Sequence, residues 1–492
     1  MEMRELERRT IEEFDVTGEE LMRRAGGGVA QVAADFLSAH GGKSILLIAG
    51  TGNNGGDVFA AATELSQSDF GIEVWICGAQ NTIAGDAQLH LKKMIRAGIL
   101  PKEVHSFSDL NPKMPPDLII DGLLGTGSKG APRGFMSSLI EWMNEEAQFA
   151  FVISIDIPSG VDSDSGAAAG TAVKADLTVT IGLPKSGLIR APALPYTGGV
   201  ETIDIGIPPE LKELVDGDYE AELIDRSDLL IPRRERAGYK NQYGHTLLIG
   251  GGEETAGAIA MSARAALRSG AGLVTIFTPE EIASTVAVLA GPEIMVRPIK
   301  RNEIPAYNET YNSILIGPGL FPAEQTKQLV TYYLSASTVP LVLDAGALCV
   351  SPSTIAAAKC PVILTPHPGE FARLFETPVT DRLTQARAAA EATGKIIILK
   401  GAGTIVAAPD ETAGVNLTGN PGMATAGAGD VLAGIAAALL AKNMPPFATA
   451  KTAVFLHGTA GDIAALDFGQ ESMTAVDIID ALPDAFRSLT IR

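Results

Sequence analysis

The chain has 492 residues, more than a single hydrophobic core usually serves, so at least two domains are expected. Hydrophobic residues make up 46% and charged residues 20%, which excludes a disordered chain and favours compact α/β domains. The net charge of −20 argues against nucleic acid as a partner, although backbone amides at a helix start can still bind a mononucleotide.

The cysteines and the N-terminal segment indicate in which cellular compartment the protein is expected. Only three cysteines occur, Cys77, Cys349 and Cys360, and none forms a CxxC pair. This pattern argues against a disulfide framework or a zinc site and predicts a reducing compartment, by default the cytoplasm. The segment MEMRELERRTIEEFDV lacks the apolar core of a secretory signal, and no apolar run is long enough to cross a membrane. A soluble protein without a membrane partner is predicted.

Short apolar runs alternate with amphipathic stretches from residue 43 onward, which is typical of βαβ units with a buried parallel sheet. The first series of expected strands is KSILLIAG, IEVWICG, DLIIDGLLGTG, FVISIDIPSG and DLTVTIG, with a helix over DAQLHLKKMIRAG. The second series is HTLLIGGG, LVTIFTP, EIMVRPI, SILIGPGL, PLVLDAGAL, PVILTPHPGE and KIIILKG. The two series predict two α/β domains, each with helices layered on a sheet.

Between the two series the apolar periodicity fades, and Pro, Gly and charged residues cluster. This composition is typical of an interdomain connection. We therefore place the boundary near residues 215–225, with one domain over 1–215 and the other over 225–492. The sequence leaves the oligomeric state open, including a homo-oligomer.

A glycine-rich turn, GTGNNGGDV over Gly50–Val58, follows the first expected strand. Its glycines permit close backbone approach, and a helix starting there offers unpaired N–H groups to an anion. Later strands end at Asp121 and at Asp156 with Ser159. Ligands in open parallel sheets lie beyond the carboxyl ends of strands, so these side chains and the Asn53–Asn54 pair should converge there. The alternative is that the Asp and Ser side chains merely cap helices.

The motifs NNGGD, DxxxGTG and DIPSG, in this order, resemble the NAD(P)HX epimerase family, also called the YjeF N-terminal domain, over roughly residues 1–210. The resemblance implies a Rossmann-like α/β/α domain that interconverts the R and S epimers of NAD(P)H hydrated at C6 of the nicotinamide ring. It implies a bound potassium ion with ligands at Asn54, Asp121 and Ser159. It implies substrate contacts at Asn53, Asn54, Gly55, Gly56, Asp57, Gly125, Thr126, Gly127, Ser128, Lys129, Gly130, Ala131 and Asp156.

The chemistry of epimerisation needs a carboxylate near the ring that can move a proton while the hydrate opens or loses water. We assign this role to Asp156. Oxygen ligands suit a hard monovalent cation, which is consistent with potassium. The family usually has Pro at the position of Thr51 and Gly at that of Val58, and neither departure falls on an implied ligand.

The most informative stretch of the second half is NPGMATAGAGDVLAGIAAALLA, residues 420–441. Gly427 and Gly429 precede Asp430, and a glycine turn that leads into a helix forms an anion hole from backbone amides. A carboxylate beside such a hole is the minimum equipment for phosphoryl transfer to an alcohol, since one accepts the proton and the other the developing charge. The alternative is that Asp430 only stabilises the helix N-terminus.

Three other motifs fall at expected strand ends. LKGAGTIVAAP reads as strand, glycine turn and strand, and GPGL over Gly317–Leu320 has two glycines that can admit a ligand. TPHPGEF holds His367 and Glu370. A lone histidine is usually structural, but the prolines on both sides of His367 fix its loop and favour a functional role.

The ordered set YKNQYGHTLLIGG, GPGL, TPHPGE, KGAGT and NPGMATAGAGD resembles the ADP-dependent NAD(P)HX dehydratase family over about residues 226–492. The resemblance implies a ribokinase-like α/β/α fold that uses ADP, or ATP in some members, to drive water off the S hydrate, and magnesium is expected at this site. It implies hydrate contacts at Ala258, Gly319, His367 and Asp430. It implies nucleotide contacts at Lys400, Gly401, Ala402, Gly403, Thr404, Asn420, Gly422, Met423, Ala424, Thr425, Gly427 and Gly429.

The dehydratase motifs also show departures. Gly346 stands where the family commonly has a second Asp, and Ala426 and Ala428 stand where Gly and Ser or Thr are frequent. Loss of a hydroxyl at Ala428 weakens one phosphate hydrogen bond and leaves the backbone amides intact. Our mechanistic hypothesis is that Asp430 acts as base while a phosphoryl group is transferred to the C6 hydroxyl, which makes that oxygen a good leaving group.

Two other functions fit part of the pattern. A ribokinase-like anion hole also fits a small-molecule kinase, for example of a vitamin precursor or sugar alcohol, fused to an accessory domain. The anion hole occurs in one chain with the motifs NNGGD and DIPSG. This favours repair of hydrated NAD(P)H over a kinase, because one substrate then serves both domains. The first half also fits a binding module without turnover. The sequence leaves open the choice between NADHX and NADPHX and between ADP and ATP.

Overall fold

The computed structural model describes residues 3–212, 221–231, 234–300, 303–306, 310–321, 323–410 and 412–490. Its internal contacts divide the chain into two compact units, Met1–Asp218 and Tyr219–Arg492. The boundary expected near 215–225 falls in part on residues 213–220, which lie outside the described residues. Within the described ranges, no helix combines the length and the apolar character that a membrane crossing requires.

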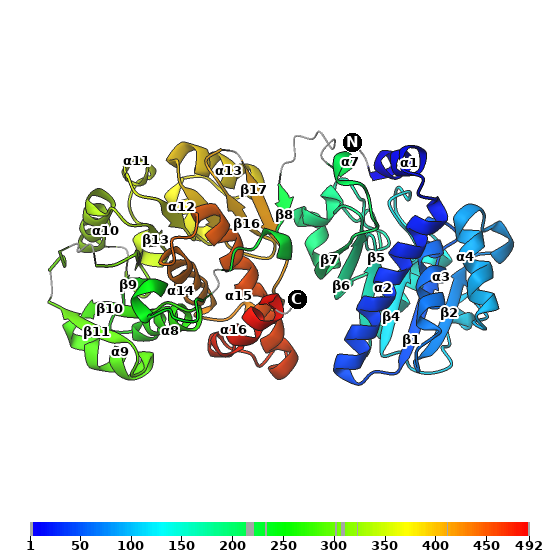
Figure 1. Cartoon of the computed structure of the whole chain (residues 1–492), viewed down its shortest axis with the longest axis horizontal. Helices are drawn as coiled ribbons and strands as arrows, with labels where there is room; N and C mark the ends of the chain where they lie inside the picture. Colours follow the sequence, from blue (N-terminus) through cyan, green and yellow to red (C-terminus); the bar gives the residue numbers. More distant parts are fainter. Residues whose placement is uncertain are drawn as a thin grey trace. The chain divides into compact units, whose positions relative to one another are not determined.

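The first unit is built on a seven-stranded sheet in the order β3-β2-β1-β4-β5-β6-β7 (Figure 1). All neighbouring strands pair in parallel. The strands are β1 (Ser44–Ala49), β2 (Gly71–Cys77), β3 (Lys102–Val104), β4 (Leu118–Gly122), β5 (Phe151–Ile155), β6 (Leu177–Ile181) and β7 (Gly199–Ile203). The five strands predicted from apolar runs are confirmed. The sequence analysis missed β3 and β7, because these edge strands are short or half-exposed and lack a buried apolar run.

Strand β1 explains why the central strands read as continuous apolar runs. Ile45, Leu47 and Ala49 belong to the core beneath α2, α3 and α4. Leu46 and Ile48 belong to a second core that includes α5. The helices of this unit are α1 (Met3–Glu13), α2 (Gly18–His40), α3 (Asn53–Leu65), α4 (Gly85–Arg96), α5 (Phe135–Glu146), α6 (Leu194–Thr197) and α7 (Pro209–Lys212). Because helices cover both faces, every side chain of β1 is buried.

The strand order reverses between β1 and β4, and this reversal positions the first site. Connections leave β1 and β4 in opposite directions, so a crevice opens beyond their carboxyl ends. A Cβ on Gly50 would lie 2.0 Å from the Leu123 carbonyl oxygen, and one on Gly55 would lie 2.0 Å from the Gly50 carbonyl oxygen. Glycine at these two positions therefore lets α3 begin directly against the sheet edge.

The second unit contains a ten-stranded sheet in the order β11-β10-β9-β12-β13-β14-β15-β16-β17-β8. Its strands are β8 (Glu222–Leu223), β9 (His245–Ile249), β10 (Leu273–Pro279), β11 (Met295–Ile299), β12 (Ser313–Ile316), β13 (Leu341–Leu343), β14 (Val362–Leu364), β15 (Ile396–Leu399), β16 (Thr404–Ala407) and β17 (Ala413–Asn416). The seven predicted strands of the second series are β9 to β15. Only β16 pairs antiparallel with its neighbours. The strand order reverses between β9 and β12.

Helices α8 (Ala256–Arg268) and α14 (Ala428–Leu440) form a closely packed pair in the core of this unit. A Cβ on Gly434 would lie 2.2 Å from the Ser262 carbonyl oxygen, so only glycine allows this approach. Every residue of α14 from Val431 to Leu440 is buried, which explains its Ala- and Leu-rich sequence. The other helices are α9 (Ala283–Ala290), α10 (Glu324–Ala336), α11 (Pro352–Ala356), α12 (Pro368–Leu374), α13 (Arg382–Thr393), α15 (Pro446–Phe468) and α16 (Ala475–Thr490).

Candidate active sites

A cavity of about 600 Å³ lies at the carboxyl ends of the strands of the first sheet. The start of α3, the loops after β4, β5 and β6, and residues of α1 and α2 form its walls. Of the residues selected from the sequence, the cavity is lined by Asn53, Asn54, Asp57, Gly125, Thr126, Gly127, Ser128 and Asp156.

The remaining predicted contacts of the first unit do not line this cavity. Gly55 and Gly56 are buried in the first turn of α3, where a Cβ on Gly56 would lie 2.6 Å from the Met22 sulfur. Lys129 and Gly130 are exposed, and Ala131 is half-buried beside them. Asp121 and Ser159 lie behind the wall and are fully buried.

Asp121, Ser159 and Asn54 form one hydrogen-bonded group behind the wall. The Asp121 carboxylate accepts hydrogen bonds from Ser159 Oγ at 2.6 Å, from Ser159 N at 2.9 Å and from Ser154 Oγ at 2.8 Å. Asn54 Nδ2 donates to the Leu124 carbonyl at 2.8 Å, and Ser159 Oγ accepts from Leu124 N at 2.8 Å. Burial raises the pKa of Asp121, against the lowering effect of these hydrogen bonds. The donors are all neutral, so the buried carboxylate has no counter-charge among them.

A charged cluster faces the cavity itself. Lys185, after β6, forms an ion pair with Asp156, and both side chains are largely buried. Asp156 also accepts a hydrogen bond from Ile181 N at 3.1 Å, and its backbone has a φ of +68°, a left-handed conformation that directs this residue out of the strand. Asp57 lies close by and accepts no hydrogen bond from the described residues. Burial, followed by the charges of Asp156 and Glu7, raises the pKa of Asp57 well above its ordinary value.

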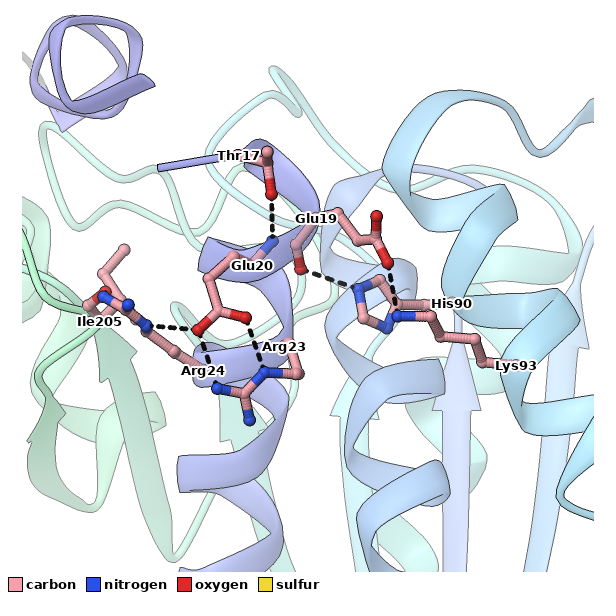
Figure 2. A network of polar contacts seen from close by, with 8 residues as sticks. All are labelled: Thr17, Glu19, Glu20, Arg23, Arg24, His90, Lys93 and Ile205. Carbon is pink, nitrogen blue, oxygen red and sulfur yellow. Dashed lines mark hydrogen bonds and ion pairs between the residues drawn. The ribbon is translucent and has the colours of Figure 1, made fainter. Parts of the chain in front are cut away.

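A polar network holds the start of α2 (Figure 2). Gly18, Leu21 and Met22 of this helix line the cavity. Thr17 Oγ1 caps the helix by accepting from Glu20 N at 3.1 Å. The Glu20 carboxylate pairs with Arg23 and Arg24, and Arg24 donates to the Ile205 carbonyl at 3.0 Å. His90 and Lys93 of α4 contact the Glu19 carbonyl and carboxylate (Figure 2). The network therefore ties this wall of the cavity to α4 and to the segment after β7.

In the second unit, the structure brings the four predicted hydrate contacts to one edge of the sheet. The α8 start, with Ala258, adjoins the Gly319 loop, since Thr255 Oγ1 donates to the Gly319 carbonyl at 2.7 Å. Ser262 Oγ donates to the Asp430 carbonyl at 2.9 Å and to the Ala258 carbonyl at 3.2 Å.

His367 is the N-cap of α12, where its Nδ1 accepts from Gly369 N at 3.0 Å and from Glu370 N at 3.3 Å. His367 thus has a structural role as a helix cap, and its side chain is still 54% exposed at the site.

Asp430 lies in a cluster of one lysine and three carboxylates. Lys400 Nζ lies 2.7 Å from Asp344 Oδ1 and 3.8 Å from Glu370 Oε2. It also lies 3.1 Å from the point where Gly429 would carry a Cβ, which places the ammonium group against the first turn of α14. Burial, and next the charge of Asp344, raises the pKa of Asp430 to about 7, against the opposing effect of Lys400. A carboxyl group with this pKa can change protonation state near neutral pH.

Both predicted nucleotide loops are held by side chains that the sequence analysis did not select. Arg382 donates to the carbonyls of Leu399 and Lys400, each at 3.1 Å, and to that of Ala402, and so fixes the turn between β15 and β16. Asp462 of α15 accepts from Asn420 Nδ2 at 3.0 Å and from Gly419 N at 2.8 Å. Gly427, with a φ of +93°, is the N-cap of α14. The segments Lys400–Thr404 and Asn420–Gly429 thus flank the start of α14.

His457 of α15 also contacts the start of α14. Its Nε2 is buried and has no hydrogen-bond partner in the described structure. Burial lowers its pKa to about 4, against the effect of a hydrogen bond to the Ala428 backbone, and the nearby Lys400 charge lowers it further. His457 is therefore neutral at physiological pH.

The structure explains two positions, Gly346 and Val58, at which the sequence departs from the family patterns. A Cβ on Gly346 would lie 2.0 Å from the Leu320 carbonyl oxygen, so this backbone has no space for an aspartate there. Val58 is fully buried, and a Cβ on Gly122 would lie 2.3 Å from its Cγ2. The glycine at 122 therefore makes room for the valine.

Four charged residues that complete the two clusters were not selected from the sequence. Asp344 follows β13 directly, so the strand-end rule that selected Asp156 would also have found it. Lys185 lies in the loop after β6, four residues beyond the end of the strand. Glu370 was noted with its motif but given no role. Glu7 belongs to α1, far from any strand, and no signal in the sequence indicates its place at the cavity.

Two family models match the chain. YjeF-related protein N-terminus matches residues 18–187, and NAD(P)H-hydrate dehydratase matches residues 246–484. The bifunctional NAD(P)H-hydrate repair enzyme Nnr of Moorella thermoacetica is 36% identical, over 99% of this chain and 96% of its own length. The corresponding enzyme of Escherichia coli is 35% identical, over 98% of this chain and 92% of its own length.

The second unit is also similar to a solved structure, the ADP/ATP-dependent NAD(P)H-hydrate dehydratase from Bacillus subtilis co-crystallized with ATP/Mg2+. The sequence identity is 31% and the TM-score 0.52, and the match covers 55% of this chain and 99% of the other. Together with the sheet orders, this similarity confirms the predicted fold class.

Proposed function

This chain belongs to the family of bifunctional NAD(P)H-hydrate repair enzymes, and we propose that its two activities are divided between its two units. It is an enzyme with an epimerase and a dehydratase activity toward hydrated NAD(P)H. The first unit interconverts the R and S hydrates, and the second dehydrates the S form with ADP or ATP as co-substrate. The observation that carries the proposal for the second unit is the position of Asp430 in the first turn of α14, after a glycine turn and beside the Lys400 ammonium group.

In the second unit, Asp430 accepts the proton of the C6 hydroxyl as its oxygen attacks the terminal phosphorus of the nucleotide. Backbone amides of the Gly427–Gly429 turn hold that phosphate, and the Lys400 ammonium lies against the same turn. The bond from phosphorus to the bridging oxygen breaks as the new phosphate ester forms. The C6–O bond then breaks with phosphate as leaving group, a proton leaves C5, and the nicotinamide ring of NAD(P)H is restored.

Magnesium fits this site only together with the nucleotide. Among the described residues, no group of three or more His, Cys, Asp and Glu side chains is arranged to hold a metal ion. Asp344 and Glu370 already contact Lys400. Magnesium is usually held by one or two carboxylates, water and substrate phosphates, and these two carboxylates would serve. The ion would supply positive charge that offsets the phosphates.

In the first unit, Asp156 accepts a proton from the substrate and Asp57 donates one. Asp156 forms the ion pair with Lys185 and lines the cavity, and we assign it as the group that accepts a proton from the hydrate. Asp57 lies in the same cavity, and burial raises its pKa well above the ordinary value, which favours the protonated form that a proton donor needs. One of these carboxyl groups is paired with a lysine and the other is not, so the two can act as base and acid in one cavity. The nicotinamide ring of the hydrate then lies between them.

Potassium fits the group formed by Asn54, Asp121 and Ser159. All three offer oxygen atoms, and Asp121 is a buried carboxylate whose partners are neutral. A monovalent cation held by these oxygens would supply the missing counter-charge, and its site would adjoin the Leu123–Ser128 wall of the cavity.

Recovery of NADH from its hydrate tests the assignment. A mixture of the R and S hydrates is incubated with the full chain and ADP or ATP, and the nicotinamide absorbance is followed. We expect both epimers to be recovered completely, because the first unit supplies the S form to the second. Accumulation of a stable phosphorylated product would instead indicate a small-molecule kinase. Recovery of the R form only at its spontaneous rate would indicate that the first unit is a binding module.

A further inference from the structure

A second cavity, of about 580 Å³, lies in the second unit away from the candidate active site. It is lined by residues at the C-terminal ends of α8 and α14, among them Leu267, Arg268 and Lys442. Ala258 and Asp430 lie at the opposite ends of these helices. A helix of this length extends about 20 Å, so the cavity is separate from the nucleotide loops.

The lining is rich in positive charge although the whole chain carries a net charge of −20. The cationic side chains are Arg234, Arg264, Arg268 and Lys442, and the acidic one is Glu293. Asp480 of α16 lies 3.6 Å from Arg264 and 3.9 Å from Arg268, at the outer limit for an ion pair. We refer to this site as the basic cavity.

Some of these charges stabilise helix ends, and that role does not account for all of them. Lys442 Nζ donates to the Ser269 carbonyl and Arg234 to the Gly270 carbonyl, each at 2.8 Å, so both cap α8. Arg264 and Arg268 have no such carbonyl partner among the described residues.

Two polar groups at the cavity, the buried Ser269 and the half-buried Lys442, are incompletely compensated. Ser269 is 1% exposed, lines the cavity, and its hydroxyl has no hydrogen-bond partner among the described residues. Burial, and next the charge of Arg234, lowers the pKa of Lys442 to about 8. A bound anion would supply the opposite charge that Lys442 lacks and an acceptor for the Ser269 hydroxyl.

The rest of the wall is apolar. It consists of Ile231, Leu267, Ala290, Pro483 and Phe486. Cationic and apolar surfaces side by side match a ligand with an anionic and an apolar part, and the volume lies within the range for small-molecule sites. We propose that the basic cavity binds an organic phosphate of nucleotide size, with the phosphates toward Arg264, Arg268 and Lys442. The organic part then lies against Leu267 and Phe486.

The α8–α14 pair connects the basic cavity with the dehydratase site. The two helices approach most closely at Gly434 and Ser262, and Ser262 holds the Asp430 carbonyl. A ligand that fixes the C-terminal ends of both helices therefore acts on the element that carries Asp430.

Calorimetric titration of ADP into the full chain tests the proposal, with Arg264→Gln/Arg268→Gln as the test variant. Lys327→Gln/Lys359→Gln is the matched control, because it removes the same charge from exposed positions of the same unit away from the cavity. We expect the test variant to bind one ADP fewer per chain than the wild type and than the control. This expectation holds even if the active site binds no ADP, since the count then falls from one to none. The same number of bound ADP molecules in all three proteins would overturn the proposal.

Two further measurements keep the test decisive. If the double variant fails to fold, Arg268→Gln alone replaces it, because this side chain is 54% exposed. We expect ADP to bind about tenfold more weakly at the basic cavity of this variant. Unchanged binding would overturn the proposal. Titration with inorganic pyrophosphate separates the anionic from the organic part. We expect weaker binding than for ADP, and equal affinity would contradict the organic part of the assignment.

Discussion

The two candidate active sites share one arrangement and differ in which carboxylate the lysine contacts. In the first unit Lys185 pairs with Asp156, and Asp57 is left without a hydrogen bond. In the second unit Lys400 pairs with Asp344, and Asp430 is left with a raised pKa. In both sites burial is the largest cause of the raised pKa, and neighbouring carboxylates add to it. In each site the lysine thus contacts one carboxylate of the cluster, and burial raises the pKa of another.

The sites also differ in what surrounds the cluster. The first is a cavity with Glu7 of α1 on its wall, suited to enclosing a ring and moving protons on it. The second lies at the start of a buried helix preceded by a glycine turn, suited to holding a phosphate. In the proposed function, similar clusters of charges therefore serve proton transfer in one unit and phosphoryl transfer in the other. If this comparison holds, a substitution in one site should change the activity of that unit and leave the other activity unchanged.

The largest expected effect separates the two units. Asp430→Asn keeps the shape of the side chain and removes the proton acceptor, so we expect dehydration to fall by about 10² to 10⁴-fold. Epimerisation should be unchanged, which a coupled assay with added wild-type dehydratase unit measures. Asp467→Asn, at an exposed position of α15, is the control and should retain both activities. Dehydration at the native rate in the variant would remove the basis of the comparison.

The converse substitution in the first unit is Asp57→Asn. Because it removes the proton donor, we expect epimerisation to fall by about 10²-fold while dehydration of the S hydrate is retained. Asp69→Asn, exposed in the same unit, should have no effect.

The same variant also has a predicted effect on stability. A raised pKa means that the folded chain holds a proton that the unfolded chain releases above the ordinary value of 3.8, so stability falls as the pH rises beyond that value. Asparagine does not titrate. We therefore expect Asp57→Asn to melt at a higher temperature than the wild type at pH 7, with a smaller difference at about pH 4. A variant that is less stable at pH 7 would contradict the burial of an uncompensated carboxyl.

A smaller effect tests the electrostatics of the second cluster. The charge of Glu370 raises the pKa of Asp430, so Glu370→Gln should lower it. Dehydration requires ionised Asp430, and in the wild type its rate should therefore rise with pH to a plateau above about 7. In the variant the rise should move to lower pH. Glu391→Gln, exposed on α13, should leave the profile in place, and a profile unaffected by Glu370→Gln would mean that another group controls the rate.

The smallest effect concerns nucleotide binding. Asp462→Asn weakens the hydrogen bonds that position Asn420 and Gly419. A hydrogen bond to a charged group contributes about 1.5 to 3 kcal/mol, and much of this is retained by an amide oxygen, so we expect about a fivefold increase in the KM for ADP with little change in kcat. Initial rates at varied ADP concentration measure this. A lower kcat with an unchanged KM would place Asp462 outside nucleotide binding.

The sequence predicted the central parts of both sheets because buried parallel strands such as β1 and β9 are continuous apolar runs that end in glycine. It could not predict β7, whose residues are half-exposed at an edge. Asp121 and Asp156 were predicted from their places at strand ends. The Asp462–Asn420 contact joins residues 42 positions apart in sequence, and no local pattern specifies such a contact. The pairings of the two lysines likewise depend on tertiary packing.

Titration of the aspartate carboxyl groups by carbon-13 NMR tests the account most directly, with Asp57→Asn and Asp430→Asn used to assign the two signals. We expect Asp430 to titrate near pH 7 and Asp57 well above the ordinary value of 3.8. If both signals titrated at the ordinary value, burial would not raise the pKa of either carboxyl group, and the account of both sites would be contradicted.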